Sequence, residues 1–111
     1  TWTEAHNSPG ATDTGIAWAV ADGDVSVDGR ERATYLLVAN PTDVPADVQV
    51  TLLFGTRSPV VSRRFRVGAG SRFGVDVGEV FPEARGQRFG ALVESLGALA
   101  PGIVVERAMY A

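Results

Sequence analysis

Apolar and polar residues alternate along most of this chain, and a period of two restricts it to folds built from β-strands. The clearest stretch is ADVQVTLLF at 46–54, in which Val50 and Leu52 face one way and Gln49 and Thr51 the other. No window of about 11 residues sustains a helical stripe. The pattern therefore predicts an all-β protein.

Glycine and proline turn signals divide the chain into strand-sized pieces. Seven strands are expected, at 16–21, 33–40, 46–54, 60–67, 71–77, 89–95 and 103–110. This spacing predicts a seven-stranded, Ig-like antiparallel β-sandwich, with a small β-barrel as the alternative. The two longest links, 22–32 and 78–88, are where we expect the chain to cross between sheets, and a helical turn is a candidate structure for the second.

The strand alternation also predicts which side chains fill the core. Those expected inside are Tyr35, Leu37, Val50, Leu52, Phe65, Phe73, Val75 and Val93.

Length and charge limit the function. A chain of 111 residues builds one domain, so we expect 1–111 to be a single module. The net charge of −3 argues against nucleic acid as a partner. The sequence contains no apolar run of about 18 residues, so no membrane span is expected. Cysteine is absent, which excludes disulfides, a thiol nucleophile and cysteine-based metal sites.

The stretch DGDVSVDGRE at 22–31 is a weak calcium candidate, because oxygen-rich loops can hold this ion. Its carboxylates are Asp22, Asp24, Asp28 and Glu31. The spacing departs from that of an EF-hand: Val27 stands where that loop needs glycine, and its twelfth position is not a glutamate. A solvated turn, which favours the same residues, is the preferred interpretation, and no cofactor is expected.

Two glutamates on the last two strands raise the possibility of a hydrolase. Glycoside hydrolysis uses two carboxylates on either side of a sugar bond. If the two strands form a hairpin, Glu94 and Glu106 lie on the order of 10 Å apart along it. No sign of a pocket accompanies them, so catalysis is disfavoured.

A basic segment suggests contact with anions or polysaccharide. It holds Arg63, Arg64, Arg66 and Arg72, on strands expected to form a hairpin. The favoured alternative is a solvated sheet face whose charges also protect an edge strand from aggregation.

Few other residues suggest chemistry. Trp18 lies in an apolar strand and is expected in the core, whereas Trp2 could stack on a sugar ring. His6 is the single histidine and is interpreted as an ordinary loop residue.

Several stretches, in their order, resemble the Ig-like modules that occur in tandem in large secreted or surface-attached bacterial proteins. They are TYLLVANP, SRFGVDV and VVERAMY, with TWTEAH at the start of the chain. The likeness covers nearly the whole chain. It implies one unit of a longer multi-module chain, outside the cell, and it supplies no catalytic residue.

The resemblance favours a non-enzymatic structural or adhesive module, acting as a spacer, a filament unit or a partner-binding surface. Its partners would be neighbouring modules, other copies of the chain, or a surface polysaccharide or protein. A carbohydrate-binding module is the alternative, and a hydrolase is a weaker one. Glu106 and Arg107 point to opposite faces of the last strand, so each is expected to meet its own structural partner, Arg107 a carboxylate and Glu106 an arginine.

Overall fold

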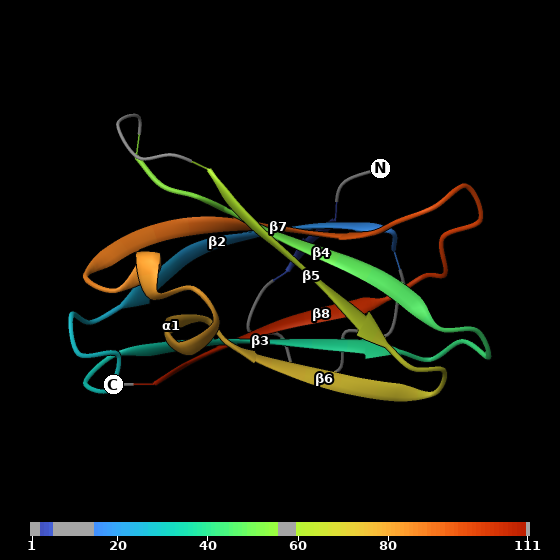
Figure 1. The fold of residues 1–111 in the computed structure, drawn as a ribbon, viewed down its shortest axis with the longest axis horizontal. Coiled ribbons are helices and arrows are strands. Elements are labelled where there is room, and N and C mark those ends of the chain that lie inside the picture. Colours follow the sequence, from blue (N-terminus) through green and yellow to red (C-terminus); the bar gives the residue numbers. More distant parts are fainter. Residues whose placement is uncertain (1–2, 6–14, 56–59, 111) are drawn as a thin grey trace.

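Strands make up most of the computed structural model, which describes residues 3–5, 15–55 and 60–110 (Figure 1). The strands are β1 (Thr3–Ala5), β2 (Ala17–Val25), β3 (Ala33–Asn40), β4 (Ala46–Leu53), β5 (Val61–Val67), β6 (Ser71–Asp76), β7 (Gln87–Ser95) and β8 (Val104–Tyr110). A one-turn helix α1 (Val77–Val80) and a 3-10 turn η1 (Pro82–Ala84) separate β6 from β7. The seven predicted strands are present as β2 to β8, and the short β1 was not predicted.

The strands form two sheets that pack face to face. The larger sheet has the order β1-β2-β7-β4-β5 and the smaller has the order β6-β3-β8. Short β1 pairs in parallel with β2, whereas all other pairs are antiparallel. The predicted β-sandwich is confirmed, and within the described residues the sheets do not close into a barrel. None of the described helices is long or apolar enough to cross a membrane.

The central strand pairs match those of an immunoglobulin domain, but the outer strands do not. Counting β2 as the first of seven strands, the second pairs with the fifth (β3 with β6) and the third with the sixth (β4 with β7). In an immunoglobulin constant domain the first strand lies beside the second and the last beside the sixth. Here β2 lies beside β7 and β8 beside β3, so the first and last strands have exchanged sheets, and the fourth strand, β5, lies beside the third, β4, instead of the fifth.

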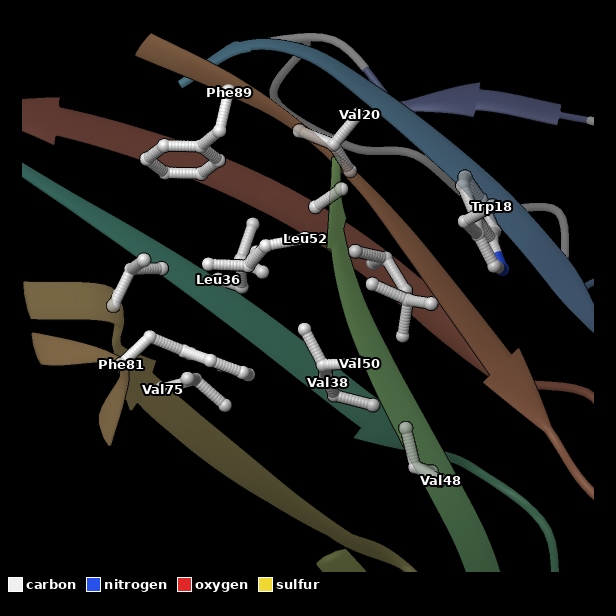
Figure 2. Close-up of a cluster of buried hydrophobic side chains, with 14 of the residues drawn as sticks. Trp18, Val20, Leu36, Val38, Val48, Val50, Leu52, Val75, Phe81 and Phe89 are labelled. Atoms are coloured by element: carbon white, nitrogen blue, oxygen red, sulfur yellow. The ribbon is translucent and has the colours of Figure 1, made fainter. Parts of the chain in front are cut away.

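Aliphatic and aromatic side chains from both sheets fill the space between them (Figure 2). Leu36, Val50 and Phe81 are completely buried. Trp18 is also in the core, as predicted, and its indole N–H donates to the carbonyl of Ile103 at 3.0 Å. This bond joins β2 to the start of β8 across the sandwich.

Four of the eight predicted core residues, Val50, Leu52, Val75 and Val93, are fully buried. The prediction for β3 is wrong: Leu36 and Val38 point inward, while Tyr35 and Leu37 lie on the outer face. Residues 35–39 are all apolar or aromatic, so alternation could not identify the buried face.

The two phenylalanines predicted to lie in the core, Phe65 and Phe73, lie at the edge of the core and are only partly buried. Phe73 is on the inward side of β6 but is 37% exposed, because β6 is an edge strand. Its ring packs against that of half-buried Phe65, with centroids 5.2 Å apart. This contact joins β5 to β6 along one open side of the sandwich.

Both long links cross between the sheets, as predicted. Strand β2 extends to Val25, so the first crossing is confined to 26–32, and the second carries α1 and η1. The two expected hairpins are wrong: β5 and β6 lie in different sheets, and so do β7 and β8. Short loops join these strands, but each loop carries the chain to the opposite layer.

Candidate functional site

An open groove of about 620 Å³ lies where β4 ends and β7 begins, and it extends between the two sheets. We call it the end groove. Its lining residues are Ala21, Asp22, Asp24, Leu53, Phe54, Gly55, Arg88, Phe89, Gly90, Arg107 and Met109. Charged or aromatic residues of β2, β7 and β8, with Phe54 directly after β4, therefore line this groove.

A β-bulge in β2 shapes one wall of the groove. Val20 pairs with Ala91 and Gly23 with Phe89, so two residues of β2 stand opposite Gly90 alone. The second of them, Asp22, has a φ of 59°, a left-handed conformation that aspartate tolerates better than most residues. The bulge re-aims the side chains that line the groove.

Gly23 is required by the way Phe89 packs. A Cβ at Gly23 would lie 2.2 Å from the Phe89 ring, closer than atoms can approach. The ring is nearly buried, and it meets Phe54 edge-on with centroids 6.4 Å apart. Phe54 is half-buried and forms the more accessible aromatic surface of the groove.

Arg107 crosses from the smaller sheet to the larger one. It pairs with Leu36 in register, so its side chain enters the space between the sheets. A terminal guanidinium nitrogen (Nη1) donates to the carbonyl of Ala21, within the bulge. The Nε of Arg107 is buried and has no hydrogen-bond partner among the described residues. The expected carboxylate partner of Arg107 is thus replaced by a backbone carbonyl.

Glu106 lies on the opposite face of β8, beside Leu37. It borders a shallow depression of about 230 Å³ together with Arg72. No ion pair between them, or to any other described residue, is present. An arginine, Arg72, therefore lies near Glu106, as expected, but does not form an ion pair with it.

Glu94 and Glu106 lie on the outer faces of different sheets. Glu94 stands on the outer face of the larger sheet, between Ala17 and Gln49. Glu106 stands on the outer face of the smaller sheet, so the two carboxylates point away from each other. The hairpin expected from the sequence would have placed them on the order of 10 Å apart on neighbouring strands, whereas the crossing between sheets puts them on opposite outer faces.

The acidic loop is held together by its own side chains. Asp28 accepts hydrogen bonds from Ser26 and from the amides of Arg30 and Glu31, at 2.8, 2.9 and 3.2 Å. These bonds, with that of the Arg30 amide the strongest, lower the pKa of Asp28 to about 2.

The remaining calcium candidates are dispersed. Asp24 forms an ion pair with Arg32 at 3.0 Å, and Asp22 lines the end groove. In the ranges described by the structure, no group of three or more histidine, cysteine, aspartate or glutamate side chains gathers closely enough to hold a metal ion.

The four predicted basic residues are spread over both sheets. Arg63 points inward from β5, donates to Glu83 at 3.0 Å and lies 5.1 Å from the centre of the Phe81 ring. Arg64 and Arg66 lie on the outer face, where they contact other side chains of the larger sheet. Since β5 is an edge strand, this arrangement favours the protective interpretation. Trp2 and His6 lie outside the described residues.

Sequence reasoning missed the aromatic and basic residues of the end groove, namely Phe54, Arg88 and Phe89. A single signal was available. Gly23 lies two residues beyond the strand-like run 16–21, and an isolated glycine in a strand often marks a bulge or a close approach.

No family model matches the chain, and no curated protein matches it. Several solved structures resemble its fold, including the following two. One, the Anabaena sensory rhodopsin transducer, aligns with a TM-score of 0.68 and 23% identity over 87% of this chain and 98% of that one. The other is Thermotoga maritima 1070, with a TM-score of 0.65 and 14% identity over 86% of this chain and 94% of that one. At these identities the likeness concerns the fold alone.

Proposed function

We propose that this chain is a non-enzymatic β-sandwich module that acts as a structural, partner-binding unit of a larger secreted or surface-attached bacterial protein. One observation carries the first part of the proposal. The two carboxylates that could have served a hydrolase, Glu94 and Glu106, point outward from different sheets. Glycoside hydrolysis needs two carboxyl groups within about 5–10 Å on either side of one bond, and this pair does not provide that arrangement.

The contacts of the other charged residues support the same proposal. Arg107 reaches the carbonyl of Ala21, Arg63 bonds Glu83, and Asp28 closes its own loop. These charges stabilise the sandwich and are not gathered around a common point. The placement in an extracellular multi-module protein rests on the sequence resemblance.

A polysaccharide panel tests the absence of catalysis. The chain is incubated with each polymer, and new reducing ends are measured for the parent, Glu94→Gln and Glu106→Gln. We expect no release above a buffer control for any of the three. Release by the parent that either variant abolishes would overturn the proposal.

The end groove favours carbohydrate binding as a second candidate function. Phe54 offers a partly exposed ring in a groove that Asp22 and Arg88 also line, and a carboxylate and a guanidinium are groups able to bond sugar hydroxyls. A glycan array of the parent, Phe54→Ala and Arg88→Ala tests this candidate. Arg66→Ala, a substitution in β5 outside the groove, is the matched control. Binding that both groove variants lose and the control keeps would favour it, and no binding by the parent would exclude it for the sugars on the array.

A further inference from the structure

The outer face of the smaller sheet exposes apolar and aromatic side chains at its centre and at one end. Leu37, at its centre, is 38% exposed, and Tyr110, at one end, is 60% exposed. We call this surface the small-sheet face. Its apolar members, set by the pairing of β6, β3 and β8, are Tyr35, Leu37, Ala39, Gly74, Val104, Ala108 and Tyr110. A sheet face exposed to water is usually lined by polar residues, so this one is suited to being covered.

Two opposite charges flank the centre of this face. Arg72 on β6 is level with Ala39, and Glu106 on β8 is level with Leu37. They stand on the two outer strands, on either side of β3, and border the same shallow depression. Neither forms an ion pair with another described residue, and the remaining charged residue of the face, Asp76, lies opposite Tyr35.

We propose that the small-sheet face docks onto the same face of a second copy of this chain. A two-fold axis in the plane of the contact, passing between Leu37 and Ala39, exchanges the positions of the two charges. It thereby brings Arg72 of each copy against Glu106 of the other, over an apolar centre. A surface with an apolar middle and opposite charges on its two sides is self-complementary, as a two-fold contact requires.

The size of the face sets the strength of the contact. Three strands about 4.8 Å apart and about seven residues long cover roughly 300 Å² of flat area per copy. Stable interfaces bury about 800 Å² per partner, so an isolated pair of modules associates weakly. When modules are linked in tandem, short linkers raise the effective concentration to about the millimolar range, where weak contacts of this kind become occupied. This part of the inference rests on the proposed function.

Sedimentation velocity of the isolated chain tests the contact. Between about 10 µM and about 1 mM we expect the sedimentation coefficient to rise toward that of a dimer, as fits a small interface. Leu37→Asp should abolish the rise, because it buries a charge at the centre of the contact. Arg66→Glu, a charge reversal on the larger sheet, is the matched control and should leave the rise intact.

Exchanging the charges of Arg72 and Glu106 tests whether these two residues meet across the two-fold contact. Arg72→Glu and Glu106→Arg should each weaken dimerisation about tenfold or more, and the double variant should restore it, because the attraction then runs in the opposite sense. The unfolding midpoints of all variants are measured in parallel, so that loss of association is not mistaken for loss of fold.

Three results would overturn the inference: a parent that stays monomeric at about 1 mM, a Leu37→Asp variant that still dimerises, or a double variant that fails to recover. If the parent binds an unrelated protein partner through this face but not itself, the choice of a second copy is wrong. None of these results bears on catalysis, which the polysaccharide assay measures separately.

Discussion

The outer faces of the two sheets differ in how their side chains are used. On the larger sheet, polar groups satisfy one another across neighbouring strands. Arg64 donates to Gln49 at 3.0 Å, and the hydroxyls of Thr51 and Ser62 lie 2.9 Å apart. On the small-sheet face, apolar side chains are exposed, and Arg72 and Glu106 form no ion pair with a residue that the structure describes. The outer face of the larger sheet therefore pairs its polar groups with one another, although it also exposes Leu53, whereas the small-sheet face has apolar residues at its centre.

The largest loss of stability should come from truncating the buried side of β3. Leu36→Ala should lower the free energy of unfolding by about 2–5 kcal/mol, since Leu36 is completely buried. Leu37→Ala, at the next position on the outer face, should cost less than about 1 kcal/mol in the monomer. Urea unfolding at low protein concentration measures both. Equal losses would break the contrast between the two sides of this strand.

The bulge of the larger sheet should be the next most sensitive feature. Gly23→Ala places a methyl group against the Phe89 ring and should destabilise the fold by about 1–3 kcal/mol. Gly74→Ala, on the small-sheet face, is the control: its Cβ would meet Leu37 at an ordinary 3.6 Å. Thermal unfolding of both variants gives the comparison. A Gly23→Ala protein as stable as the parent would mean that Phe89 moves freely and that the bulge wall is not fixed.

Removing polar groups from the two outer faces should have unequal effects on stability. Gln49→Ala removes the acceptor of Arg64 and should cost about 0.5–1 kcal/mol, in the range of an exposed hydrogen bond. Glu106→Gln removes a charge that has no described partner and should leave the monomer within about 0.5 kcal/mol of the parent. A larger loss in Glu106→Gln would show that the small-sheet face is already satisfied within one chain.

The smallest effect concerns the loop that connects the two sheets after β2. The pKa of Asp28 is lowered from 3.8 to about 2 in the folded chain, so its contribution to stability is complete above pH 4. It should be lost as the pH falls from 4 to 2, because the proton removes the charge that the loop amides bind. Asp28→Asn should be less stable than the parent at pH 6, and the difference should vanish near pH 2. Urea melts at four pH values check the trend, and a gap independent of pH would contradict it.

The sequence predicted best where its pattern was unambiguous. In β4 every second residue is apolar, and Val50 and Leu52 are buried as expected. In β3 all positions from 35 to 39 are apolar or aromatic, so two faces were equally plausible. Phe73 shows a further limit, because alternation reports which way a side chain points and not how near it lies to the edge of a sheet.

Which strands pair with each other, and which residues form the candidate site, could not be predicted, because alternation within a strand does not show which other strand lies beside it. Consecutive strands are neighbours in most proteins, which made a hairpin of β7 and β8 the natural expectation. The chain changes sheet instead, and this separates Glu94 from Glu106 and carries Arg107 into the end groove. One wall of the groove depends on the register shift of one residue in β2. In the sequence, Gly23 was the one indication of this shift.

The path of the chain between the sheets has a consequence for folding kinetics. From β2 to β8, five of the six connections between the described strands change layer: β2 to β3, β3 to β4, β5 to β6, β6 to β7 and β7 to β8. Neither sheet can be completed before strands from distant parts of the chain have paired. The chain therefore loses much of its conformational entropy before the stabilising strand pairings form. We expect slow, cooperative refolding, in milliseconds to seconds, as is usual for proteins rich in non-local pairings. For the same reason, a protease cut in any of these connections should release no stable half.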